Sequence, residues 1–396
     1  WLVIGSLTSM LLGLLLSILY ARYLPKETYG SYRYVLSIVS IVGIFSLPGF
    51  GTAIMRASAR GFDGTFRRLS RIMFFSSFGI SAVCMGAAVF FFFYDQKELV
   101  LALAIAALFI PFVEGLGNWK GYLDGKKQFK NKMVYNITTQ IIYSVLMSAA
   151  VISSYAFGFG LLLTLALLVG TYMLAHALPN IYFYARTLRT IPAHAPEEPG
   201  SIRYGLHLSA SSTFATCATY LDGILLYHFV GPSALAVYSF AIVLPEQIKV
   251  LLASYITVSF PKLAAKTADT NAQASIKKTL PRKIFKASLL SAIVVGSYIV
   301  AAPFAYQILF PAYIESIPYS QVFILSLLLF PFSIFGPSIQ IEGRIKKIYL
   351  ESIIGPLIQI ILLLILLPLF GIWGAVWGRV IGRTVNFLIE FIIFMK

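Results

Sequence analysis

Arg379 and Arg383 lie four residues apart inside a long apolar stretch of the chain. If that stretch is a helix, both guanidiniums project from one face. A guanidinium holds phosphate oxygens through two parallel hydrogen bonds, so the pair suits a diphosphate group. The same spacing suits ion pairs with acidic side chains of neighbouring helices, and the sequence leaves both interpretations open.

A second group of charges follows Pro245. Glu246 and Lys249 lie three residues apart, and they form either an internal ion pair at a kink or a site in which Lys249 faces a cavity. In the second case Glu246 sets the charge of the lysine or relays protons. Asp222 is a candidate for a coupling cation or proton, or for a structural partner of Arg379 or Lys249. An ionisable group at mid-bilayer costs about 2.5–3.5 kcal/mol, so each requires compensation.

The remaining candidates lie towards the ends of apolar stretches. Arg56 and Lys262 suit first contacts with an anionic headgroup, although basic residues at such positions are also ordinary topology signals. Glu114 either faces an internal space or makes a satisfied polar contact, and Arg22 and Arg33 are candidates for an exit site. The four histidines show no metal-ligand spacing. The sequence therefore predicts no metal site. It also predicts no enzyme, because the outer loops are too short to carry the catalytic residues of a membrane glycosyltransferase or polysaccharide polymerase.

The elements that carry these residues are predicted to be membrane helices. Of the 396 residues 59% are hydrophobic and 12% are charged, against about 25% charged in soluble proteins. The apolar runs are close to the roughly 20 residues that a membrane-spanning helix needs. The predicted spans are residues 1–21, 34–55, 72–94, 98–119, 133–153, 159–185, 204–230, 234–260, 287–309, 320–341, 348–369 and 371–394. Trp1 already lies inside a span, so we expect the natural N-terminus to lie upstream.

Lysine and arginine are distributed unequally between the predicted loops. Most of them follow even-numbered spans, and the opposite loops hold only Arg22, Lys26, Arg33 and Lys97. Because cytoplasmic loops carry the excess of basic residues, we expect both termini to be cytoplasmic and the protein to lie in the inner, or plasma, membrane. The net charge of +16 is then explained by topology and by attraction to anionic membrane lipids, without nucleic acid.

The two halves of the chain resemble each other. Residues 24–32 align with 230–238, and without a gap Arg56 then aligns with Lys262. This predicts an all-α integral membrane fold of about twelve helices in two six-helix bundles, related by a parallel pseudo-two-fold repeat. The predicted domains are residues 1–190 and 200–396, with a cytoplasmic linker at 186–203.

Several segments resemble one family. Residues 21–32, followed by an apolar span that ends at 49–56, are similar to the opening of polysaccharide-biosynthesis flippases of the multidrug/oligosaccharidyl-lipid/polysaccharide (MOP) superfamily. Residues 220–226, 230–232 and 237–241 look like the seventh and eighth spans of that family, and 371–378 look like the start of its last spans. The resemblance covers essentially the whole chain, but its motifs describe the scaffold more than the chemistry.

The resemblance implies a flippase that moves a polyprenyl-diphosphate-linked oligosaccharide, such as an O-antigen unit, to the outer leaflet by alternating access. It implies no ATP and no cofactor, and it leaves coupling to a proton or sodium gradient open. The expected partners are the lipid-linked glycan, membrane lipids and other polysaccharide-assembly proteins. Two alternatives remain, namely a cation-coupled exporter of drugs or metabolites on the same fold, and a transport-inactive scaffold of the assembly complex.

Overall fold

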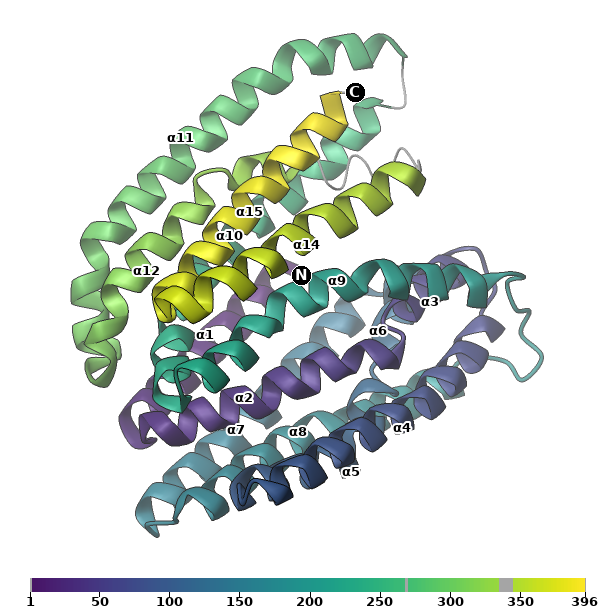
Figure 1. The fold of residues 1–396 in the computed structure, drawn as a ribbon. Coiled ribbons are helices and arrows are strands. Elements are labelled where there is room, and N and C mark those ends of the chain that lie inside the picture. The colour runs from purple at the N-terminus through teal and green to yellow at the C-terminus, as the bar shows by residue number, and fades with distance from the viewer. Residues whose placement is uncertain (1, 268–269, 335–344, 396) are drawn as a thin grey trace. The chain divides into compact units, whose positions relative to one another are not determined.

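The computed structural model describes residues 2–267, 270–334 and 345–395, and side chains for 5, 7–252, 285–333 and 352–392. Within these ranges the chain forms α-helices and short 3-10 helices and no strand (Figure 1). It divides into two compact units, Trp1–Ile224 and Leu225–Lys396, here called the first and second units. The division falls inside a helix, and the predicted pair of six-helix domains stays a prediction.

The first unit contains eight complete helices and most of a ninth. These are α1 (Leu2–Tyr23), α2 (Lys26–Val42), α3 (Gly49–Ala59), α4 (Gly64–Phe93), α5 (Lys97–Glu114), α6 (Trp119–Gly125), α7 (Phe129–Ala156), α8 (Leu161–Arg189) and α9 (Ser201–Phe229). Helices α4, α5 and α8 lie side by side (Figure 1), as do α1, α7 and α8. The turn predicted between spans five and six is confirmed, because α7 ends at Ala156 and α8 begins at Leu161.

The second unit holds the other helices of the described residues. These are α10 (Pro232–Thr267), α11 (Thr270–Leu309), α12 (Ile317–Phe323), α14 (Ile345–Phe370) and α15 (Ile372–Met395), with 3-10 helices at Pro311–Ser316, Ile324–Leu327 and Phe330–Ile334. Helix α15 packs along α14 and also contacts α12 (Figure 1). Among the described residues, seven helices are long and apolar enough to cross a membrane, or eight if α2 and α3 form one bent span.

The predicted second span, residues 34–55, is wrong as a continuous helix. Helix α2 gives way to a 3-10 turn at Gly43–Ser46, and Leu47 adopts a left-handed conformation with φ 61° before α3 begins. The two helices meet at 48°. Pro48 explains the break, because a proline disfavours the helical conformation in the residue before it.

The predicted outer loop between spans one and two is also wrong. Helix α2 begins at Lys26, directly after Pro25, and therefore includes Arg33. Thr28, Ser31 and Tyr32 in this segment are buried. A hydropathy profile reads such side chains as a polar loop, whereas here they form the interior face of a helix.

Two further spans differ from the prediction. The fourth, predicted at 98–119, is α5 up to Glu114, followed by a short irregular stretch and α6. The tenth, predicted at 320–341, consists of α12 and 3-10 turns up to Ile334, and its remainder lies outside the described residues. Apolar composition predicts that a segment crosses the membrane, but it does not predict where the hydrogen-bonding pattern changes.

The two units have separate aromatic cores. In the first unit Phe50, Phe66 and Trp119 are fully buried, and the rings of Tyr135 and Phe183 stack at 4.0 Å between centroids. In the second unit Phe240, Tyr306, Phe310 and Tyr313 are fully buried, and the Tyr306 hydroxyl donates to the carbonyl of Phe240 at 2.8 Å. Each core fixes the helices that carry the candidate residues.

Candidate functional site

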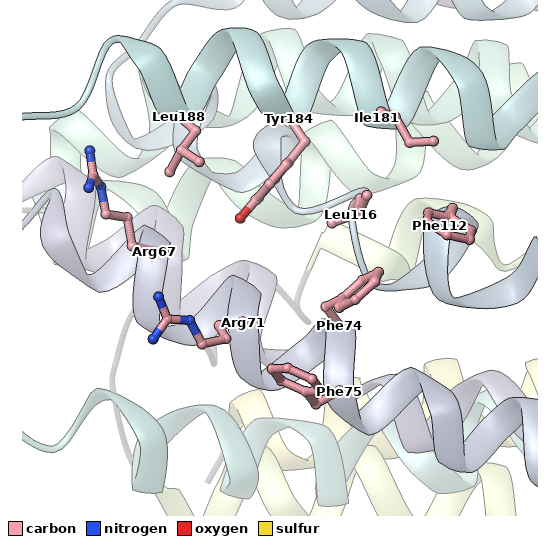
Figure 2. Close-up of a pocket in the computed structure, with 9 residues that line it drawn as sticks. All are labelled: Arg67, Arg71, Phe74, Phe75, Phe112, Leu116, Ile181, Tyr184 and Leu188. Atoms are coloured by element: carbon pink, nitrogen blue, oxygen red, sulfur yellow. The ribbon is translucent and has the colours of Figure 1, made fainter. Parts of the chain in front are cut away.

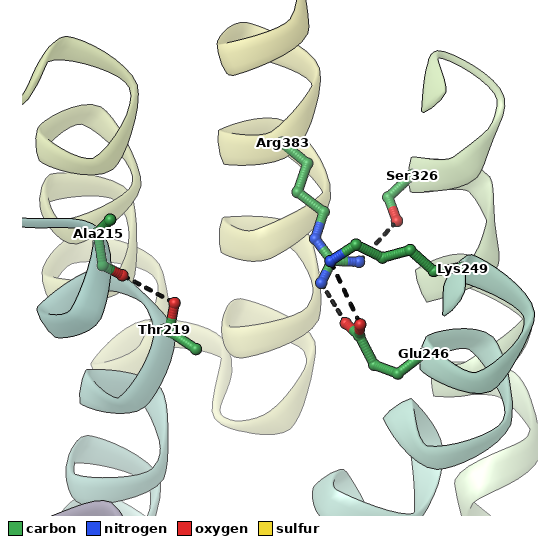
Figure 3. A network of polar contacts seen from close by, with 6 residues as sticks. All are labelled: Ala215, Thr219, Glu246, Lys249, Ser326 and Arg383. Atoms are coloured by element: carbon green, nitrogen blue, oxygen red, sulfur yellow. Dashed lines mark hydrogen bonds and ion pairs between the residues drawn. The ribbon is translucent and has the colours of Figure 1, made fainter. Parts of the chain in front are cut away.

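The charges of α10 and α15 converge on one carboxylate. The Lys249 ammonium lies 3.4 Å from Glu246 Oε2, and Arg383 Nη2 donates to Glu246 Oε1 (Figure 3). Arg383 Nη1 also donates to Ser326 Oγ at 3.3 Å. Two cations therefore share one carboxylate, and among the side chains that the structure describes the cluster keeps an excess of positive charge. We call Glu246, Lys249 and Arg383 the cationic triad.

The triad is only partly closed to its surroundings. The side chain of Arg383 is 17% exposed, whereas those of Glu246 and Lys249 are 31% and 37% exposed. The Arg383 guanidinium lies over the Phe323 ring, 4.7 Å from its centroid. The arginine is thus held in place by Glu246, Ser326 and Phe323, while the lysine remains the more accessible cation for an anionic ligand.

Arg379 lies one turn before Arg383 on α15. It is 8% exposed, and its guanidinium lies 5.9 Å from the centroid of the Tyr238 ring. Arg383 forms an ion pair with an acidic side chain of another helix, Glu246, which is one of the two interpretations that the sequence leaves open. The binding of a diphosphate by Arg379 and Arg383 stays a prediction.

Asp222 and Arg33 both lie inside the first unit, on α9 and α2. Asp222 is 3% exposed on α9 and accepts a hydrogen bond from the backbone N–H of Gly223 at 2.7 Å. Its carboxylate attracts the guanidinium of Arg33, which lies on α2 close to the rings of Tyr29 and Tyr32. Arg33 is therefore half-buried inside the unit, not in a surface loop, whereas Arg22 at the end of α1 is exposed.

Glu114 lines a polar cavity of about 440 Å³ in the first unit. The cavity lies among the bend between α2 and α3 and helices α4, α5, α6 and α8, and Lys120, Tyr172 and His176 line it as well. Asn180 on its wall accepts a hydrogen bond from Trp119 Nε1 at 3.2 Å and donates to the carbonyl of Val113 at 2.8 Å. Glu114 thus lies in the wall of this cavity beside Lys120, and the choice between the two interpretations stays a prediction.

Arg56 lies in an ion-pair network at the end of α3. Its Nε is 3.4 Å from Glu198 Oε1, and its guanidinium lies 4.4 Å from the centroid of the Tyr204 ring. Glu198 also pairs with Arg60 at 2.9 Å. The network ties the connection between α8 and α9 to α3. The side chain of Lys262, which the repeat aligns with Arg56, lies outside the described residues.

Residues 1–266 match the model of a family described as polysaccharide biosynthesis protein. The chain belongs to this family, as a multi-pass membrane protein. Comparison of its sequence with curated proteins finds none that matches.

Solved structures with the same fold are membrane transporters. The lipid II flippase MurJ in an inward closed conformation aligns over 99% of this chain and 87% of its own, with a TM-score of 0.74 and 13% identity. An inward-facing multidrug resistance MATE transporter of the MOP superfamily aligns over 98% of this chain and 94% of its own, with a TM-score of 0.67 and 16% identity. A MOP superfamily transporter from Pyrococcus furiosus is described as having a binding pocket of reverse polarity. It aligns over 99% of this chain and 94% of its own, with a TM-score of 0.63 and 14% identity.

These likenesses confirm the fold class predicted from the sequence. The relatives have a helical fold of twelve helices in two lobes, and the family match confirms the resemblance to polysaccharide biosynthesis proteins. At 13–16% identity the structures establish the fold and leave the substrate of this chain open.

Sequence reasoning missed several residues around these sites. Ser326 carries no signal, because a serine in an apolar segment is common and its partner Arg383 is far away in the chain. Lys120 directly follows the predicted fourth span and His176 is one of the four histidines, and both line the cavity of Glu114. A helical spacing of four residues places His176 with Tyr172 on one face of α8, and this spacing is the sequence signal that indicates His176.

Proposed function

We propose that this polysaccharide biosynthesis protein is a flippase for polyprenyl-diphosphate-linked oligosaccharides in the inner membrane, with both termini in the cytoplasm. The observation that carries the proposal is the cationic triad, in which Lys249 and Arg383 exceed the charge of Glu246 inside helices of a membrane protein. Excess positive charge at such depth is costly unless an anion is bound there for part of the working cycle.

The chemistry of the substrate explains what the protein has to supply. A diphosphate and a sugar chain pay a prohibitive desolvation penalty in hydrocarbon, while the polyprenyl chain remains soluble in the bilayer. Lys249 offers a mobile point charge for a phosphate oxygen, and Arg379 and Arg383 offer planar donors. When the diphosphate binds, it competes with Glu246 for both cations, and the released carboxylate is then a candidate group for proton or sodium coupling.

The proposal is tested by reconstitution in liposomes. Transbilayer movement of a fluorescent polyprenyl-diphosphate oligosaccharide is measured for the wild type and for an Arg379→Ala/Arg383→Ala variant. We expect the wild type to move the lipid and the variant to lose the movement. An Arg186→Ala/Arg189→Ala variant removes the same charge from the exposed end of α8 and is expected to keep it. Movement by all three proteins would retain the function and reject the site.

One observation supports a second candidate, a cation-coupled exporter. Glu114 shares its cavity with Tyr172, and an acid beside an aromatic ring suits an organic cation. Uptake of a fluorescent organic cation into the same liposomes under a proton or sodium gradient distinguishes the two functions. Movement of the cation that is lost in Glu114→Gln, together with no movement of the glycolipid, would replace the flippase by the exporter.

A further inference from the structure

A groove on the first unit shares no lining residue with the sites described above. It has a volume of about 500 Å³ and runs between α4, the end of α5 and α8 (Figure 2). Its lining consists of Arg67, Arg71, Phe74, Phe75, Phe112, Leu116, Ile181, Tyr184 and Leu188. The groove is polar at one end and apolar along the rest.

The polar end presents three hydrogen-bond donors. Arg67 and Arg71 lie one turn apart on α4, and the hydroxyl of Tyr184 points from α8 into the space between the helices (Figure 2). This hydroxyl lies within electrostatic range of both guanidiniums. Arg67 Nη2 donates to the carbonyl of Ile191 at 2.6 Å, which fixes that side chain, and its buried Nε has no partner in the described part of the chain.

The nearby acidic residues are engaged elsewhere. Glu197 pairs with Arg68 at 2.8 Å, and Glu198 pairs with Arg56 and Arg60. Among the described side chains, none of the acidic ones forms an ion pair with the two arginines of the groove. The polar end therefore attracts an anion, and a phosphate oxygen matches the fork of an arginine.

The apolar end faces outwards. Phe75 is 65% exposed and Ile181 is 39% exposed, and Phe74 and Phe112 lie between them with their rings 5.8 Å apart. In a membrane this surface meets lipid chains. The groove thus combines a phosphate-binding end with a wall that accepts hydrocarbon.

The depth of the arginines suits a lipid headgroup. Helix α4 has 30 residues and is therefore about 45 Å long, which exceeds the roughly 30 Å of the hydrocarbon core. Arg67 and Arg71 lie in its first two turns, so they can sit at headgroup level while Phe74 and Phe75 begin the hydrocarbon part. The sequence predicts that this end is cytoplasmic, where anionic lipids are enriched.

We propose that the groove is a binding site for an anionic phospholipid, with its phosphate on Arg67, Arg71 and Tyr184 and an acyl chain along Phe74 and Phe112. The acyl chain of the lipid moves from one apolar environment to another and gains little binding free energy, so the preference for one lipid over another depends on the headgroup. The site is independent of the transported substrate. It fixes the cytoplasmic ends of α4 and α8 to the leaflet.

The proposal is tested by native mass spectrometry of the purified full chain in detergent with added phosphatidylglycerol or phosphatidylcholine. We expect the wild type to retain phosphatidylglycerol selectively. Arg71→Ala is expected to weaken that retention about tenfold, in line with the loss of one charge-assisted hydrogen bond. Arg71→Lys should restore part of it. Arg68→Ala removes the same charge from the same helix but outside the groove, and it is expected to retain the lipid.

Three outcomes would overturn the site. If Arg68→Ala and Arg71→Ala lose equal amounts of bound phosphatidylglycerol, the binding is a general effect of positive charge and not of the groove. Equal retention of phosphatidylcholine by the wild type would remove the role of the headgroup. Displacement of the lipid by glycerol 3-phosphate, which has no acyl chains, would show a site for free phosphate in place of a lipid site.

Discussion

At the level of single residues, Glu246 balances two cations at once. Glu246→Gln keeps the shape of the side chain but leaves Lys249 and Arg383 without their counter-charge. Breaking a fully buried ion pair costs about 3–5 kcal/mol, and we expect about 1–3 kcal/mol here because the triad is partly exposed. The apparent Tm in detergent, measured by thermal unfolding, should therefore fall by several degrees.

A matched control separates this effect from a general loss of negative charge. Asp95→Asn removes the carboxylate of an exposed pair with Lys97, whose side chains are 85% and 71% exposed, and should leave the Tm almost unchanged. Adding Arg383→Gln to Glu246→Gln removes one orphaned cation and should recover part of the loss. A Glu246→Gln protein as stable as the wild type would mean that the triad is hydrated and contributes no stability.

The sequence predicts the residues of these sites better than it predicts their partners. A charge within an apolar stretch is visible in the sequence because its cost is high, and Arg383, Glu246 and Lys249 were found in this way. Arg383 binds both Glu246 and Ser326, which lie on two other elements, and no spacing within one segment of the sequence predicts these contacts. The carboxylate of Asp222 likewise acts electrostatically on Arg33, a residue that the sequence analysis assigns to a loop.

At the level of elements, the break between α2 and α3 depends on a close contact with α9. The backbone N–H of Gly49 donates to Ser209 Oγ at 3.0 Å, and a Cβ at Gly49 would lie 2.4 Å from the backbone nitrogen of Ser209. Because backbone atoms must then move, we expect Gly49→Ala to destabilise the protein by about 1–3 kcal/mol. The measurement is the apparent Tm of the purified variant.

Gly51 on the same helix provides the control. A Cβ there meets nothing within 4 Å, so Gly51→Ala gains helix propensity without a clash. We expect an unchanged or slightly higher Tm for Gly51→Ala. If both variants lose the same stability, then α3 does not tolerate side chains on either face and the contact with α9 is not the cause.

The connection between α8 and α9 is held by two glutamates of unequal weight. The Glu198 side chain is 9% exposed and binds Arg56 and Arg60, whereas that of Glu197 is 45% exposed and binds Arg68. An exposed pair contributes at most about 1 kcal/mol, and a buried one contributes more when one partner is removed. We therefore expect Glu198→Gln to speed limited proteolysis between residues 190 and 200, and Glu197→Gln to leave it unchanged. Equal rates for the two variants would contradict this anchoring.

Elements that pack on lipid are easier to predict than elements that pack on protein. The long helices α4, α7 and α8 follow from their apolar runs, because burial in hydrocarbon acts on every residue of the run. The sequence predicts a loop at the polar start of α2, because a hydropathy profile does not register that Thr28 and Ser31 are buried inside the protein. Changes of helix type after Glu114 and Phe323 likewise depend on tertiary packing.

At the level of the whole molecule, composition and charge distribution already predict a membrane protein with a fixed orientation. The family match and the shared fold confirm that the chain is a multi-pass membrane protein, whereas its predicted orientation depends on the basic residues of the loops alone. A lysine or arginine in a short loop opposes translocation of that loop, so the basic loop between α6 and α7 should face the cytoplasm. The loop between α7 and α8 has no basic residue and should face outwards.

Cysteine labelling in intact cells tests this orientation. After Cys84 and Cys217 are replaced by alanine, Gln128→Cys reports on the loop between α6 and α7, and Phe157→Cys reports on the loop between α7 and α8. Both positions are exposed. We expect a membrane-impermeant maleimide to label Phe157→Cys at once and Gln128→Cys only after the cells are permeabilised. The reverse pattern would invert the protein, and it would place the arginines of the lipid groove in the outer leaflet, where anionic lipid could no longer be the expected ligand.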